Sequence, residues 1–150
     1  MKNLLFSLAV MIMTISLFGQ ENSIEDNRTM IMENFPGVYE TIENGAVSEW
    51  SDDEDTQEIT IIDQCFAFSE YIVFMNTDKL VIPKDTLKGI MEKALRKYSK
   101  NPIPEKACDE LIDELQKLDC ILSYMQADWV KVIIEIKEQI EVYKSVKKNT

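Results

Sequence analysis

The last third of the chain contains a long segment that no internal proline or glycine interrupts, and it limits the fold more than any other feature. The segment runs from Pro104 to about Lys147. Its apolar residues recur at alternating spacings of three and four, the pattern of a coiled coil or one long helix. A single helix of this length would span about 66 Å, far more than a domain of this size is wide. We therefore expect the segment to fold back near Tyr124–Asp128, with Asp128 as the N-cap of a second helix. The residues that carry the pattern are Cys108, Leu111, Leu115, Leu118, Leu122, Met125, Trp129, Val132, Ile136 and Tyr143.

Helical spacing also dominates the middle of the chain. Residues 57–76 are the most apolar stretch after the N-terminal twenty residues, and a helix that is apolar on two sides normally lies at the centre of a bundle. Residues 21–35 and 84–100 also show helical patterns, and prolines mark their ends. We predict an all-α fold, a bundle of four to five helices with a long C-terminal helical hairpin, as a single domain over residues 21–150. The two stripes of the central helix are Ile61, Cys65, Phe68, Ile72 and Met75, and then Ile59, Ile62, Phe66 and Val73.

Residues 38–50 contain the sequence signal of a β-hairpin. Asn44-Gly45 lies between two runs of β-favouring residues, which is the usual cue for a tight hairpin turn. An irregular loop, or a helix that ends at Gly45, fits the same residues. We keep a small β-hairpin near residues 38–50 as one expectation.

The first twenty residues have the layout of a secretory signal peptide. Lys2 supplies a short positive region, and Leu4 to Phe18 is almost wholly apolar. Such a run fits a signal peptide of about 7–15 apolar residues better than a membrane span of about 20. We expect cleavage after Gly19 or Gln20 and no membrane segment in the mature chain. An uncleaved anchor is the alternative, because Leu17 or Phe18 stands where a signal peptidase site has a small residue.

The net charge of −11 and the absence of histidine argue against several classes of function. Nucleic acids and anionic membranes repel an acidic chain, so we expect neither as a partner. Without histidine the chain lacks the usual general base, Ser-His-Asp and Cys-His arrangements and nearly every zinc site. No pair of carboxylates stands out as catalytic. We expect no enzyme, no cofactor and no metal, with a carboxylate-dependent hydrolase as the remaining catalytic alternative.

Three cysteines follow the signal peptide, and in an oxidising compartment two of them should pair. If Cys108 and Cys120 share one helix, they lie about 18 Å apart, whereas a disulfide needs Cα atoms within about 7 Å. Either Cys65 is one partner, or the helix breaks between Cys108 and Cys120. We favour a Cys65–Cys120 disulfide, because Cys120 would point sideways toward a neighbouring helix. Three unpaired buried thiols are the other alternative.

Trp50 and the acidic run after it are the candidate partner-binding residues. Trp50 stands in a polar context, where it can serve as an aromatic anchor. The run SDDEDTQE, residues 51–58, lacks the glycine of a calcium loop. It fits the solvated N-terminus of a helix or a loop that faces a partner. The predicted contact residues are Trp50, Asp52, Asp53, Glu54 and Asp55.

Two short motifs resemble the type VI secretion amidase immunity proteins. Cys65-Phe66-Ala67 is similar to the Cys-apolar-Ala segment that begins a helix in that family, and KLDCILSY, residues 117–124, resembles its later Cys-Ile-x-x-Tyr helix. A helix from Asp85 to Tyr98 lies between them in the same order. The resemblance covers roughly residues 60–140. After Tyr124 this chain has Met125-Gln126 where the family usually has small polar residues, and residues before Glu58 have no match.

The resemblance implies a periplasmic, all-α and often dimeric inhibitor. Such a protein would occlude the cleft of a peptidoglycan amidase effector and protect the cell from it. We therefore expect an exported periplasmic protein whose partner is a secreted amidase. The alternative is an envelope assembly protein that forms a homodimer through its C-terminal heptads, with Val132 and Ile136 at the interface.

Overall fold

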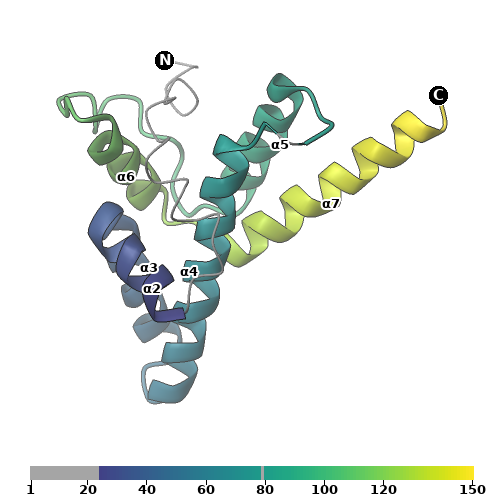
Figure 1. Cartoon of the computed structure of the whole chain (residues 1–150). Coiled ribbons are helices and arrows are strands. Elements are labelled where there is room, and N and C mark those ends of the chain that lie inside the picture. The colour runs from purple at the N-terminus through teal and green to yellow at the C-terminus, as the bar shows by residue number, and fades with distance from the viewer. Residues whose placement is uncertain (1–23, 79) are drawn as a thin grey trace.

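A computed structural model describes residues 24–78 and 80–150, and the predicted signal peptide lies outside these residues. The described residues are all-helical, as the sequence predicts, but they form six helices rather than the expected four to five. They contain no strand beyond an isolated bridge between Ser99 and Ala127. Figure 1 shows the helices arranged around a central one. They are α2 (Ile24–Asn34), α3 (Pro36–Glu49), α4 (Glu54–Asn76), α5 (Lys84–Lys97), α6 (Glu114–Met125) and α7 (Trp129–Lys148).

Helix α4 lies at the centre, in agreement with its apolar sequence. It packs against α2, α3 and α7, while α5 packs on α7 and α6 on α3. Aromatic rings join these layers. The ring of Phe68 in α4 lies 4.9 Å from that of Phe35 and 4.7 Å from that of Trp129, each in an edge-on geometry. The core is therefore continuous from the start of α3 to the start of α7.

The second apolar stripe of α4 is largely exposed, and of its four residues only Ile62 is partly buried. The first stripe is buried, as expected for Ile61, Cys65 and Phe68. In contrast, Ile59 is 59% exposed, and Phe66 and Val73 are exposed as well. A central helix thus presents an apolar outer face to solvent.

The expected β-hairpin at residues 38–50 is wrong, because this segment belongs to helix α3. Its buried residues are Val38, Tyr39, Ile42 and Ala46, which recur at helical rather than alternate spacing. Pro36 occupies the first turn, where its fixed φ and missing N–H favour the start of a helix. Gly45 lies in the helix interior, and a Cβ added there would meet no heavy atom within 4 Å.

We expect Gly45→Ala to stabilise the protein by about 0.5–1 kcal/mol, because alanine loses less backbone entropy than glycine in an open helical position. Thermal unfolding followed by circular dichroism measures this as a rise of a few degrees in Tm. Gly89→Ala in α5 is the matched control, since its added Cβ also meets no atom within 4 Å. A lower Tm for Gly45→Ala alone would favour a turn that requires positive φ at this residue.

The break in the C-terminal segment is confirmed at the expected place, but the expected helical hairpin is not, because α6 packs on α3 whereas α7 packs on α4 and α5. Helix α6 ends at Met125, and α7 begins at Trp129 with Asp128 as its N-cap. Gln126 adopts a left-handed φ of 50° in the turn. Antiparallel backbone bonds then tie the turn to the end of α5: the N–H of Asp128 donates to the carbonyl of Tyr98 at 2.9 Å.

The first half of that segment corrects the expected long helix. Residues 104–113 form turns, and α6 begins only at Glu114. The side chain of Asp113 accepts a hydrogen bond from the N–H of Gln116 at 2.9 Å and so caps the helix. Asp113 and Gln116 have the spacing of a capping box, which is a signal for a helix start.

The start of α6 at Glu114, after Cys108, determines which cysteines pair. Cys108 pairs with Cys120, with Cα atoms 5.9 Å apart, so the predicted Cys65–Cys120 disulfide is wrong. Cys108 lies in a turn rather than on the helix of Cys120, which brings together two residues that one helix would hold apart. Cys65 is a free, buried thiol, and burial raises its pKa to about 11. It therefore behaves as a small core residue and not as a reactive group.

Candidate functional site

The predicted contact residues lie at the tip between α3 and α4, which forms the lower end of the molecule in Figure 1. The side chain of Trp50 is 40% exposed there. Its backbone is fixed, since its carbonyl accepts hydrogen bonds from Nε2 of Gln57 at 2.7 Å and from the N–H of Asp53 at 3.0 Å. The tip thus presents an aromatic side chain on an ordered turn.

The acidic residues of the tip have different roles. Asp53 caps α4: its carboxylate accepts from the N–H of Thr56 at 3.0 Å and from the Thr56 hydroxyl. These hydrogen bonds lower the pKa of Asp53. Glu54 and Asp55 occupy the first turn of α4, where the helix dipole favours negative charge. Asp52 and Asp55 are exposed, as are Asp53 and Glu54.

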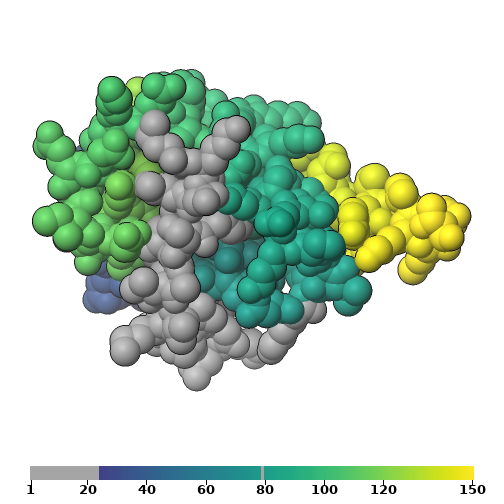
Figure 2. Space-filling view, turned by 90° about the horizontal axis from the view of Figure 1, so that it is seen from above, coloured from purple at the N-terminus to yellow at the C-terminus, as the bar shows by residue number. Residues whose placement is uncertain are grey.

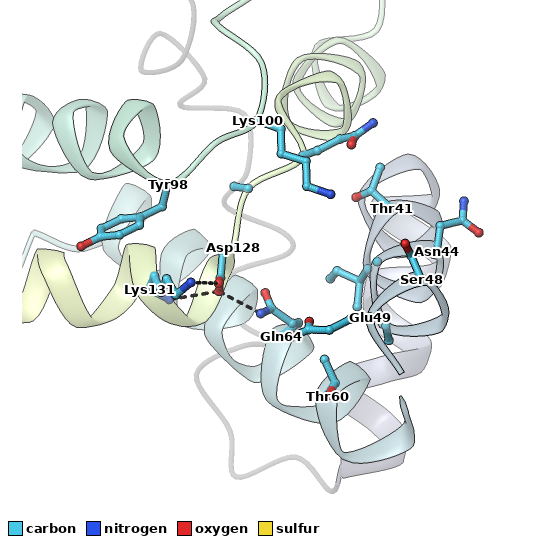
Figure 3. A pocket seen from close by; sticks show the side chains of 15 residues that line it. Thr41, Asn44, Ser48, Glu49, Thr60, Gln64, Tyr98, Lys100, Asp128 and Lys131 are labelled. Carbon is cyan, nitrogen blue, oxygen red and sulfur yellow. Dashed lines mark hydrogen bonds and ion pairs between the residues drawn. The ribbon is translucent and has the colours of Figure 1, made fainter. Parts of the chain in front are cut away.

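A groove of about 660 Å³ extends between α3 and the turn that joins α6 to α7. Figure 3 shows hydroxyl and amide side chains of α3 and α4 on one wall and Lys100 on the other. Hydroxyls and amides both donate and accept hydrogen bonds, and Ile42, Ala46 and Ala127 add apolar surface to the same lining. The polar side chains on the α3 and α4 wall are Thr41, Asn44, Ser48, Glu49, Thr60 and Gln64.

A reciprocal pair of hydrogen bonds holds the floor of the groove. Nε2 of Gln64 donates to Asp128 at 2.9 Å, and the N–H of Trp129 donates to Oε1 of Gln64 at 2.8 Å. Burial by itself would raise the pKa of Asp128, but the hydrogen bonds from Gln64 and Lys131 outweigh it and leave that pKa below its ordinary value. The amide of Gln64 therefore fixes the start of α7 against α4.

A second exposed feature, which the sequence patterns did not indicate, is the segment DELIDE at residues 109–114, called here the 109–114 loop. All six residues are exposed, and the side chain of Ile112 is 97% exposed. An aliphatic side chain with no contact is normal when isolated. Here Leu111 lies beside it and two acidic residues stand on each side. Leu111 continues the heptad pattern in the sequence, but the capping spacing of Asp113 and Gln116 separates it from the helix.

Three bonds hold the 109–114 loop in place. The Cys108–Cys120 disulfide ties its first end to α6. Asp109 lies 3.7 Å from Nζ of Lys117, and the N-cap of Asp113 fixes the second end. Figure 1 places this end of α6 far from the α3–α4 tip. The α3–α4 tip and the 109–114 loop are therefore two separate exposed ends, and the structure does not bring their residues together.

No family model, no curated protein and no solved structure matches this chain. Over residues 24–78 and 80–150, no helix is both long and apolar enough to span a membrane. In the same residues, no three acidic or cysteine side chains gather as a metal site would require.

Proposed function

We propose that this protein is an exported, immunity-type inhibitor that binds a cell-wall amidase toxin and occludes its cleft. The 109–114 loop is the observation that carries this function. It presents Ile112 fully to solvent on a turn that a disulfide and a helix cap hold. A loop that is ordered before binding loses less conformational entropy when it docks, so more of the contact energy appears as affinity.

The partner suggested by this surface has an apolar pocket with a basic rim. Leu111 and Ile112 would fill the pocket, and the four carboxylates around them would meet Lys and Arg side chains. The net charge of −11 steers the protein toward a basic partner and away from anionic ones. Trp50, Asp52, Asp53, Glu54 and Asp55 at the other end form a second proposed contact, with Asp53 acting mainly through the shape of the turn.

Two further features support export and the class of partner. A disulfide between Cys108 and Cys120 persists in an oxidising compartment such as the periplasm. The resemblance of residues 60–140 to type VI secretion amidase immunity proteins points to a peptidoglycan amidase. Binding alone requires no catalytic group, in keeping with a chain that has no histidine.

The test is a peptidoglycan digest by an amidase effector of the same or a neighbouring strain, titrated with the exported protein. We expect stoichiometric loss of amidase activity. Ile112→Asp should raise the Kd at least roughly tenfold, because a charge replaces the apolar anchor. Trp50→Ala should weaken binding by a smaller factor. Isothermal titration calorimetry measures both affinities.

Val81→Asp is the matched control, since Val81 is an 83% exposed aliphatic residue on the connection between α4 and α5. It should inhibit as the wild type does. Unchanged affinity of Ile112→Asp would remove the loop from the interface and leave the inhibitor function standing. Undiminished digestion by the wild type, with no complex on a sizing column, would contradict the function itself.

The alternative of an envelope assembly protein gains no support from its expected interface. Val132 and Ile136 have no exposed surface, because they pack inside the protein's own core. A dimer that used them would first have to open the bundle.

A further inference from the structure

The groove between α3 and the turn before α7 has no part in the proposed inhibitor function. Its volume of about 660 Å³ lies within the range of about 300–1,000 Å³ that ligand sites occupy. Of helix α7 only Lys131 lines it, next to the N-cap Asp128. Figure 2 shows the C-terminal end of α7, in yellow, protruding past the rest of the molecule, so the remainder of this helix leads away from the groove.

One side of the groove is formed by a short antiparallel pair of backbone segments. The pair is centred on the bridge between Ser99 and Ala127. Its backbone hydrogen bonds run from the N–H of Asp128 to the carbonyl of Tyr98 at 2.9 Å and from the N–H of Lys100 to the carbonyl of Gln126 at 3.5 Å. Because these bonds flank the bridge, Ser99 and Ala127 are a non-hydrogen-bonded pair. The N–H and C=O of Ala127 therefore point away from Ser99.

The backbone edge at Ala127 faces the groove. Ala127 lines the groove, whereas Ser99 does not. Figure 3 shows the chain that leads to Asp128 with Tyr98 on one side and the helix of Asn44 on the other. Within the part of the chain that the structure describes, neither backbone group of Ala127 has a hydrogen-bond partner. An unpaired backbone edge is a template on which a further extended chain can pair.

The α3 wall leaves room for such a chain. Gly45 lines the groove, and a Cβ added to it would meet no heavy atom within 4 Å. Ile42 and Ala46 add apolar surface to the same wall, beside the hydroxyls and amides. An extended peptide carries a polar backbone and alternating side chains, so a lining that is partly polar and partly apolar suits it.

The charges of the groove favour a peptide with one carboxylate. Lys131 is paired with Asp128 at 3.2 Å. Lys100 is exposed, and among the described residues it forms no ion pair. It is therefore the cation that can meet a carboxylate of the ligand. Glu49 on the α3 wall would repel further negative charge, so an acidic tract is disfavoured.

We propose that the groove binds an extended peptide segment that carries a carboxylate at the Lys100 end. The peptide backbone would donate to the carbonyl of Ala127 and accept from its N–H, as a strand added to an edge. Side chains on one face of the peptide would pack on Ile42 and Ala46. This inference goes beyond the proposed inhibitor function, because it uses neither the 109–114 loop nor Trp50.

Amide NMR spectra of the nitrogen-15-labelled exported protein, with the N-terminus that processing leaves, test the proposal. The ligand added is a library of N-acetylated pentapeptides of mixed sequence with a free terminal carboxylate, since backbone pairing tolerates many side chains. We expect saturable shifts of the Ala127 and Gly45 amides with a Kd of roughly 1 mM or below. The same library with N-methylated peptide bonds cannot donate hydrogen bonds from its backbone, so it should bind at least roughly tenfold more weakly.

Two variants probe the two walls of the groove. Gly45→Leu places a side chain in the open space and should weaken binding at least roughly tenfold. Gly89→Leu in α5 is its matched control, because its added Cβ also meets no atom within 4 Å and Gly89 lies outside the groove. Lys100→Ala should weaken binding by a smaller factor, and Lys93→Ala, at another exposed lysine outside the groove, should not. Circular dichroism checks that all variants are folded.

Four outcomes would each overturn the proposal. The first is a library that leaves the Ala127 amide unshifted, and the second is an N-methylated library that binds equally well. The third is a Gly45→Leu variant that binds like its control. The fourth is acetyl-aspartate that shifts the same amides as strongly as the library, which would make the groove a site for a carboxylate alone. None of these measurements uses an amidase, so their failure would leave the inhibitor function standing.

Discussion

Removing the disulfide by Cys108→Ala with Cys120→Ala is expected to lower the free energy of unfolding by about 3 kcal/mol. The cross-link closes a short loop, with a sequence separation of 12, and it restricts the unfolded chain by the entropy of that closure. The 109–114 loop would also lose one of its anchors. Urea unfolding under oxidising and reducing conditions measures the change.

The reducing agent supplies a control within the same experiment. The wild type should lose about the same 3 kcal/mol on reduction, and the double variant should not respond. Cys65→Ala should keep the response of the wild type, because Cys65 is a free thiol in the core. A response that Cys65→Ala abolishes would restore the Cys65–Cys120 pairing and contradict the structure.

In the C-terminal segment, the sequence predicted the helix break at Asp128 but not the start of α6, and the cysteine pairing shows the consequence. The helix break at Asp128 could be predicted because no domain of this size can hold the whole segment as one helix, and Asp128 was available to cap the second helix. The start of α6 could not be read from apolar spacing, since Leu111 continues the heptad pattern although it lies in a turn. The disulfide pairing depended on that start and was therefore wrong.

The prediction of a β-hairpin at residues 38–50 was wrong for a related reason. Asn44-Gly45 is a strong local turn signal, but the local signal competes with burial. Val38, Ile42 and Ala46 bury one helical face against α4 and α6, and this packing outweighs the turn preference of two residues. The sequence correctly predicted that the acidic run after Trp50 begins a helix. It could not identify the 109–114 loop as exposed, because exposure of Ile112 depends on where α6 begins.

Replacing Asp119 by alanine is the other change with a large expected effect. Asp119 is a buried residue of α6 whose carboxylate accepts two backbone hydrogen bonds, from the N–H groups of Gly37 and Val38, each at 2.9 Å. These groups belong to the first turn of α3, and the N-cap residue Phe35 has no side-chain oxygen to offer them. Asp119 is therefore the cap of a helix that lies about eighty residues earlier in the chain.

Asp119→Ala should lower the free energy of unfolding by about 3 kcal/mol at neutral pH, because it leaves two N–H groups without an acceptor in a buried region. Chemical denaturation measures it. Asp113→Ala is the matched control: it removes the exposed cap of α6 and should cost only about 1 kcal/mol. Equal losses for the two variants would contradict the role of burial.

Gly37 tests the same contact from the other side. A Cβ on this residue would lie 2.9 Å from Oδ2 of Asp119 and 3.0 Å from Oγ of Ser123. Gly37→Ala should thus destabilise the protein by about 1–2 kcal/mol through overpacking, whereas Gly45→Ala in the same helix should stabilise it. A stabilising Gly37→Ala would show that Asp119 does not approach the backbone this closely.

The pH dependence of the Asp119→Ala effect follows from the carboxyl group. Burial raises the pKa of Asp119 above its ordinary value of 3.8, although the two N–H donors partly oppose this. Folding then favours the protonated form, so the contribution of this group is fully present below the unfolded pKa and decreases as pH rises through the folded one. The difference in unfolding free energy between wild type and Asp119→Ala should therefore be larger below pH 3.8 than at neutral pH. A difference that grows with pH would instead mean that the N–H donors of α3 outweigh burial and lower the pKa of Asp119 in the folded protein.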